Sequence, residues 1–261
     1  MRASAILLAP TLGDNRTTRI QLCGRLAVEL EGRELTPKLP GGQARVLFTY
    51  LTVTRALPSS RDQLIEALWP YRQPAGADTA LSALLSRLRS AVGSDALCGR
   101  AEIHLQLPAE AWIDLEAAEE AIHRAEAAVA QHDWARGWGP SLIAMFTARR
   151  GFLPNEDLPW ADEYRQRLGE IHVAALECYA AVALGVGGSE LAPGERTARE
   201  LVKLAPYRER GHALLMEILT ARGNSAEALR IYEQLRERLR DELGATPAPE
   251  LRQLQQRLLQ R

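Results

Sequence analysis

The sequence predicts a mostly α protein with a small amount of β structure, in which an N-terminal winged helix–turn–helix precedes an all-α unit. Two apolar helical stripes, separated by a turn rich in proline and glycine, lie between residues 59 and 93, and strand patterns flank them. Helical periodicity with short Gly/Pro breaks fills almost everything after residue 112. The length of 261 residues agrees with two domains.

The first elements in the chain are a hairpin and a helix. Residues 20–35 predict a β-hairpin, because Leu26, Val28 and Leu30 alternate with polar residues and Gly32 supplies a turn. Residues 43–54 carry apolar side chains at helical spacing, so we expect a helix that packs beneath the next two.

A helix pair follows at residues 59–93. Ser60 and Gln63 form a capping box, which satisfies free N–H groups at a helix start, and Pro70 ends this helix. Asp78 is the expected N-cap of the second helix. That helix has one core-facing stripe, formed by Leu81, Leu85, Leu88 and Val92.

The opposite side of the second helix is small and polar, with cationic arms. At about 100° per residue this side presents Thr79, Ala83, Ser86, Arg87 and Ser90, with Arg89 on its flank. Such a surface could enter a DNA major groove about 12 Å wide. The alternative is an ordinary solvated helix face.

A second hairpin completes the winged arrangement. Ile103, Leu105 and Leu107 alternate with polar residues and predict a strand with one buried face. Its tip falls at Cys98-Gly99-Arg100, so Arg100 is the candidate wing residue for a minor groove or its phosphates.

After Asp114 the pattern is helical. We expect helices at 116–131, 161–184, 193–204, 208–221, 225–241 and 249–260, with a break at Gly137–Pro140. Gly185, Gly187 and Gly188 are expected to close the helix at 161–184. Gly223, Ala228 and Tyr232 stand at the spacing of a tetratricopeptide repeat (TPR), so antiparallel helix pairs are predicted.

Several segments together resemble one family. LIEALWP at 64–70 and SRLRSAVG at 86–93 resemble the OmpR-type winged helix, in the version found in the Streptomyces antibiotic regulatory protein (SARP) family of transcriptional activators. PYRERGHALLM, ARGNSAEALRIYE and DELGATPAPEL, within residues 201–251, resemble the bacterial transcriptional activation domain (BTAD) that follows in that family.

This resemblance implies three parts. They are a flexible N-terminal tail at 1–18, an OmpR-type winged helix DNA-binding domain at 19–108, and a BTAD with TPR-like helices at 109–261. For the tail, a signal peptide is the less favoured alternative, because Pro10 interrupts its apolar run. The charge agrees with a nucleic-acid module joined to an acidic one. Residues 1–108 carry 13 Lys/Arg against 9 Asp/Glu, whereas the whole chain has a net charge of −1.

The resemblance also implies partners. They are double-stranded promoter DNA with direct repeats, a second copy of the chain with which it forms a homodimer on that DNA, and RNA polymerase. The loop between the paired helices is the part that can contact the polymerase. The matching loop residues are Trp69, Tyr71 and Arg72. On the DNA, Arg87 would contact a base or a phosphate, and Arg89 and Arg100 would contact the backbone.

The sequence gives little support for an enzyme, a metalloprotein or a membrane protein. It contains no GxxxxGK[ST], GxSxG or HExxH motif, so we expect no enzyme, cofactor or metal. Three scattered cysteines predict reduced thiols in a cytoplasm, and no apolar run approaches the roughly 20 residues of a membrane span. The alternative to an activator is a TPR-like protein-interaction regulator with weakened or lost DNA binding, since the recognition face has one clear cation.

Overall fold

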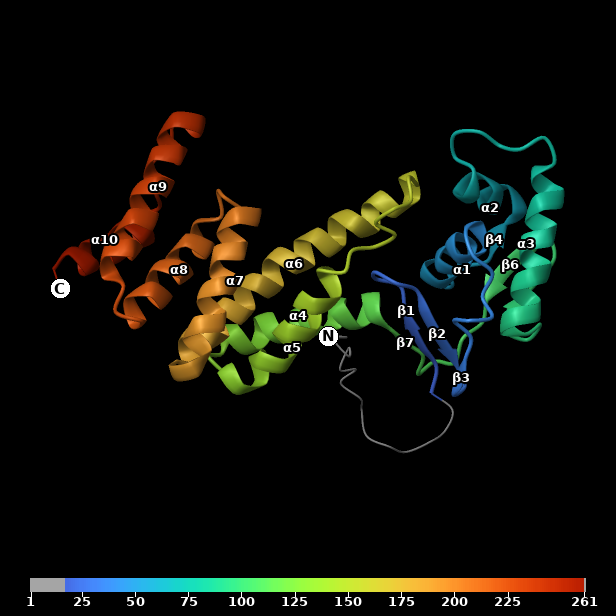
Figure 1. Cartoon of the computed structure of the whole chain (residues 1–261), viewed down its shortest axis with the longest axis horizontal. Coiled ribbons are helices and arrows are strands. Elements are labelled where there is room, and N and C mark those ends of the chain that lie inside the picture. Colours follow the sequence, from blue (N-terminus) through green and yellow to red (C-terminus); the bar gives the residue numbers. More distant parts are fainter. Residues whose placement is uncertain (1–16, 261) are drawn as a thin grey trace. The chain divides into compact units, whose positions relative to one another are not determined.

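The computed structural model describes residues 17–260, which form two compact units that divide between Ile113 and Asp114 (Figure 1). Of the tail predicted for residues 1–18, positions 1–16 lie outside the described residues. Thr18 is buried in the first unit, where its carbonyl accepts a hydrogen bond from the Trp112 N–H at 2.9 Å. The division lies five residues after the boundary expected at Pro108. The reason is that residues 112–113 still form a strand of the first unit.

That strand completes a small sheet. The strands β1 (Arg19–Gln21), β2 (Ala27–Leu30), β3 (Arg33–Glu34) and β7 (Trp112–Ile113) lie in the order β3-β2-β1-β7. The hairpin predicted at 20–35 is present as β2 and β3, and β1 pairs with β2 as a third strand. Glu31 and Gly32 both have positive φ, 49° and 77°, as the tight turn between twisted strands requires.

Three helices form the centre of the first unit: α1 (Gln43–Val53), α2 (Arg61–Leu68) and α3 (Ala77–Val92). The predicted capping box is confirmed, because the Gln63 N–H donates to Ser60 Oγ at 3.2 Å and the Ser60 N–H donates to Gln63 Oε1 at 2.7 Å. Fully buried leucines from all three helices pack together, as the apolar stripes predict: Leu47, Leu51, Leu64, Leu81, Leu85 and Leu88.

The second hairpin of this unit is built as predicted. β5 (Leu97–Cys98) pairs antiparallel with β6 (Glu102–Leu105), and β4 (Ser59–Ser60) pairs with the other edge of β6. Ile103 and Leu105 are buried, whereas Leu107 lies beyond the strand and is partly exposed. A winged helix–turn–helix is therefore the fold of the first unit.

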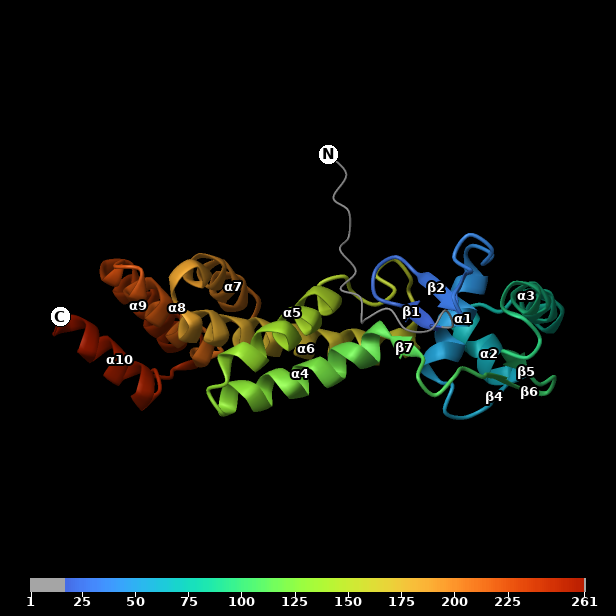
Figure 2. The ribbon, with the colours of Figure 1, turned by 90° about the horizontal axis from the view of Figure 1, so that it is seen from below.

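The second unit, described over residues 114–260, consists of helices and their connecting loops (Figure 2). Its helices are α4 (Asp114–Ala130), α5 (Trp134–Ala148), α6 (Pro159–Val186), α7 (Leu191–Leu204), α8 (Glu209–Ala221), α9 (Ser225–Leu243) and α10 (Pro249–Leu259), with a short 3-10 turn, η1, at Gly188–Glu190. Neighbours in sequence pack against each other, and α4, α6 and α8 also pack in series. The predicted mostly α fold class is confirmed.

The TPR-like spacing has the expected structural meaning. Gly223 has a φ of 83° in the turn between α8 and α9, a conformation that glycine adopts without strain. Ala228 and Tyr232 are buried on α9 in the core cluster with Leu215 and Leu219 of α8. The three residues therefore shape one antiparallel helix pair.

The predicted helix break at Gly137–Pro140 is wrong, because these residues lie inside α5. The chain reverses earlier, at His132, which has a positive φ of 57°. Asp133 then caps α5 by accepting a hydrogen bond from the Arg136 N–H at 3.1 Å. Local capping thus determines where this helix begins.

Two glycines inside helices allow close packing that propensity alone would not predict. A Cβ on Gly137 would lie 3.0 Å from Val182 Cγ2 of α6. Of the three glycines expected to close the long helix, Gly187 is the C-cap of α6, whereas Gly185 lies within the helix. A Cβ on Gly185 would lie 2.3 Å from Trp134 Cε2. The two contacts bring α5 and α6 close together at the cost of weaker local helix propensity.

The central helix α6 also departs from expectation. Among residues 17–260 it is one helix whose length and composition would suffice to cross a membrane, although no such stretch was expected. Half of its apolar window is buried inside the helical unit, where Leu176 and Val182 are fully enclosed. A core helix passes the same test, so this is weak support for a membrane span.

A buried ion pair holds the start of the second unit. The Asp114 side chain is fully buried, and Arg150 Nη2 lies 3.0 Å from its Oδ2. We expect Arg150→Met to lower the free energy of unfolding by about 1–3 kcal/mol, because a buried carboxylate loses a charged partner. Urea denaturation measures this change.

The matched control is Arg149→Met. Arg149 is exposed and lies 4.0 Å from Glu200, a distance typical of a surface pair that contributes little. Equal destabilisation by the two substitutions would contradict the special role of the Asp114 pair.

Candidate nucleic-acid interface

The candidate DNA-reading surface is the outer side of α3. Thr79, Ala83, Ser86, Arg87 and Ser90 are all exposed there, on the side opposite the buried leucines. The Ser90 hydroxyl donates to the Ser86 backbone carbonyl at 3.1 Å, which keeps the Ser90 side chain close to the helix. No bulky side chain stands on this face, so its backbone could approach the edges of bases in a major groove.

Arg87 is the one cation at the centre of this face. Its Nε lies 3.4 Å from the Ala83 carbonyl, one turn back along α3. Among residues 17–260 no carboxylate pairs with it. The rest of the guanidinium therefore remains available for a guanine edge or a phosphate, the two partners that arginine binds with paired hydrogen bonds.

Arg89, expected to contact the DNA backbone, has an intramolecular role that sequence reasoning missed. Its Nε donates to the Leu97 carbonyl at 3.2 Å, and its Nη2 donates to the Gly99 carbonyl. The side chain thus joins α3 to the wing hairpin and sets the position of the wing. A phosphate contact by Arg89 remains a prediction.

The wing tip has a constrained shape. Gly99 has a φ of 87°, and a Cβ at this position would lie 1.7 Å from the Glu102 carbonyl oxygen. Only glycine therefore fits the tip. Arg100 is exposed next to it, which is where a minor-groove or phosphate contact would require it.

A second contact missed by sequence reasoning fixes the angle between α2 and α3. Asp78 is not the N-cap of α3, because Gly76 occupies that position. The Asp78 carboxylate instead accepts from Arg61 Nε at 2.7 Å, and Arg61 Nη2 donates to Ser82 Oγ at 2.7 Å. No spacing rule pairs residues 61 and 78, so only the packed helices reveal this link.

The loop between α2 and α3 contains the residues expected to meet RNA polymerase. Trp69 is partly buried at the end of α2, whereas Tyr71 and Arg72 are exposed, Tyr71 by 69%. This loop could therefore present an aromatic ring and a cation to a partner. The polymerase contact itself remains a prediction.

The part of the chain that the structure describes shows no assembled metal site and no reactive thiol at Cys178. No group of three His, Cys, Asp or Glu side chains within residues 17–260 could hold a metal ion. Within residues 17–260 no disulfide joins any of the three cysteines. Burial, together with the negative charges of Glu126 and Glu177, raises the pKa of Cys178 to about 12, so this thiol is protonated and unreactive at neutral pH.

Comparison with known proteins agrees with this architecture. Residues 113–259 match the family described as the bacterial transcriptional activator domain. The regulatory protein AfsR of Streptomyces griseus is 33% identical over 219 residues, which cover 83% of this chain and 22% of AfsR. The transcriptional regulatory protein EmbR of Mycobacterium tuberculosis H37Rv is 26% identical over 249 residues, which cover 91% of this chain and 62% of EmbR.

A solved structure extends the comparison to the fold. Mycobacterium tuberculosis EmbR in complex with a low affinity phosphopeptide matches with a TM-score of 0.75 at 24% identity, over 94% of this chain and 65% of that chain. The chain thus spans less than two thirds of the length of these relatives, and about a fifth of AfsR. With a winged helix followed by a bacterial transcriptional activator domain, the chain belongs to the SARP family of transcriptional activators.

Proposed function

We propose that this chain binds promoter DNA at direct repeats through its winged helix and activates transcription. The helical unit supplies contacts to a second copy on the DNA or to RNA polymerase, and the protein acts in the cytoplasm without enzymatic chemistry. The observation that carries this proposal is the outer face of α3, where small polar residues surround an arginine without a carboxylate partner among residues 17–260. A wing held by Arg89 flanks that face.

The second candidate is a protein-interaction regulator with weakened or lost DNA binding. Arg61 and Arg89, two cations at the edges of α3, are occupied by contacts within the protein. That leaves Arg87 and Arg100 as exposed cations on α3 and the wing. The two candidates differ in whether the chain binds duplex DNA.

Salt dependence of DNA binding separates them. We expect the purified chain to bind a promoter duplex and to lose affinity as salt rises, because each phosphate contact releases counterions and contributes about −0.9 to the slope of log K against log salt. Fluorescence anisotropy with genomic fragments selected by footprinting measures the slope.

A shuffled duplex of the same length is the control, and it should bind more weakly at every salt concentration. Equal binding to both duplexes would contradict the proposed sequence-specific binding. Absence of binding at low salt would favour the protein-interaction candidate.

A further inference from the structure

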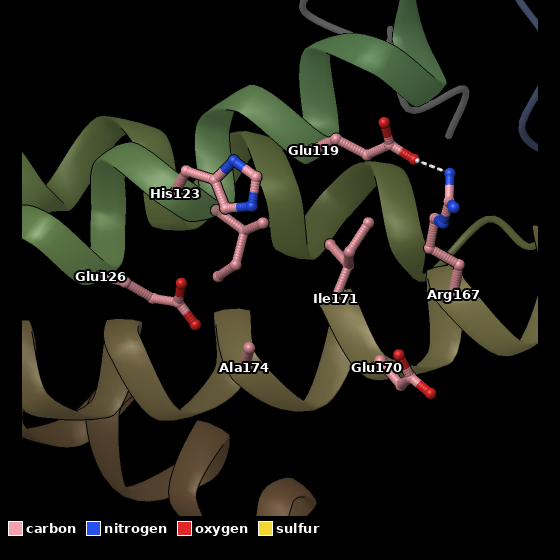
Figure 3. Close-up of a pocket in the computed structure, with 8 residues that line it drawn as sticks. Glu119, His123, Glu126, Arg167, Glu170, Ile171 and Ala174 are labelled. Carbon is pink, nitrogen blue, oxygen red and sulfur yellow. Dashed lines mark hydrogen bonds and ion pairs between the residues drawn. The ribbon is translucent and has the colours of Figure 1, made fainter.

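A groove of about 430 Å³ lies between α4 and α6 in the helical unit (Figure 3). Glu119, His123 and Glu126 line it from α4, and Arg167, Glu170 and Ala174 line it from α6. The helices pack as the pairs α4/α5, α6/α7 and α8/α9, and the first helices of these pairs also pack in series. The groove lies between the first helices of the first two pairs.

The walls of the groove are acidic. Three carboxylates and one guanidinium line it, so the acidic side chains outnumber the arginine by two. Glu119 is already neutralised, since Arg167 Nη1 lies 3.1 Å from its Oε1. Glu126 and Glu170 have no cationic partner among residues 17–260, and Glu170 accepts only an uncharged donor, Gln166 Nε2, at 3.1 Å.

The unpaired carboxylates stand on opposite walls, above an apolar floor. Ile122 of α4 and Ile171 of α6 line the groove between them, and each is largely buried. Figure 3 shows the Glu126 side chain pointing from α4 toward α6. A long aliphatic stem with a cationic end fits such a surface, because the stem covers apolar atoms while the end reaches a carboxylate.

The same polarity continues along α6. Glu177, one heptad after Glu170 and therefore about 10 Å further along the helix, contacts Arg208 at 2.5 Å. The Arg167 and Arg208 pairs show that this acidic surface already accepts guanidinium groups from its own chain at two places. Glu126 and Glu170 offer the same chemistry, and among residues 17–260 neither has a cationic partner.

We propose that the α4–α6 groove is a docking site for an arginine-bearing helical segment of a protein partner. Two arginines one heptad apart would place their guanidinium groups at Glu126 and Glu170, with their stems on Ile122 and Ile171. Nucleic acid does not suit this surface, because its phosphates would meet unpaired carboxylates. The site is independent of the DNA-reading face of the winged helix.

The test uses the full chain and a labelled alanine-rich helical peptide with two arginines seven positions apart. Fluorescence anisotropy should detect binding that weakens with salt, and a peptide with citrulline in place of both arginines should not bind. The double substitution Glu126→Gln with Glu170→Gln should weaken binding about tenfold, since it removes two carboxylates while keeping their shape.

The matched control is Glu120→Gln with Glu163→Gln, which removes two exposed carboxylates from the same helices outside the groove. It should leave peptide affinity unchanged, and neither double variant should alter DNA affinity. Three results would each overturn the proposal: no binding of the arginine peptide, equal loss in both double variants, or self-association of the chain that the groove substitutions abolish. The last result would assign the groove to a second copy.

Discussion

Binding to two adjacent repeats is expected to be about a hundredfold tighter than binding to one for the full chain, and much less enhanced for a fragment of residues 1–113. Two copies tethered on one duplex gain effective concentration without new base contacts, a gain that commonly lies between about 10² and 10⁴. The helical unit is the expected source of the tether, because it is a compact unit with its own buried core.

The fragment must end after β7 and not at Pro108. β7 pairs in parallel with β1, and Arg19 lies 5.1 Å from the Trp112 ring, so a shorter fragment would lose one edge of the first sheet. A circular dichroism melt shows whether the fragment is folded. Titration of one-repeat and two-repeat duplexes with both proteins then gives the two ratios.

Transcription provides the second measurement for this prediction. A reporter with two repeats should respond to the full chain and not to the fragment, because the proposed contacts to a second copy or to polymerase come from the helical unit. Activation by the folded fragment at the level of the full chain would refute that role.

Arg87→Ala is expected to lower affinity for the specific site by about 1–3 kcal/mol and to relax preference at one base position. The reason is that Arg87 lies at the centre of the exposed α3 face, and its one hydrogen bond within residues 17–260 is the 3.4 Å contact with its own helix. Binding assays with a panel of single-base operator variants measure both effects.

Arg100→Ala is the matched comparison, since Arg100 is also exposed but stands at the wing tip. It should weaken all duplexes about equally and reduce the salt slope by about one phosphate contact. If Arg87→Ala changed neither affinity nor preference, a different face of the first unit would have to contact DNA.

Much of the fold could be predicted because its signals are local. A capping box needs only Ser60 and Gln63, and the leucine stripes of α2 and α3 need only the helical repeat. The outer face of α3 follows from that stripe, and for this reason the exposed positions around Arg87 could be named in advance. Their contact with DNA is still a prediction.

The errors arose where distant residues decide a local conformation. Gly137 and Pro140 have low helix propensity, yet both lie inside α5, where Gly137 packs closely against Val182 of α6. The glycines after position 184 were expected to end α6, and Gly187 does so, but Gly185 stays helical where it adjoins Trp134. Tertiary contacts offset unfavourable propensities of about 1 kcal/mol per glycine.

Neighbouring residues therefore suffice to predict the winged helix, its paired helices and its family, since caps, periodicity and motifs are local. Three features emerge from the packed helices alone: Arg61 joins α2 to α3, Arg89 holds the wing, and α4 and α6 form an acidic groove. Each of these depends on side chains far apart in the chain, which meet only after the helices have packed.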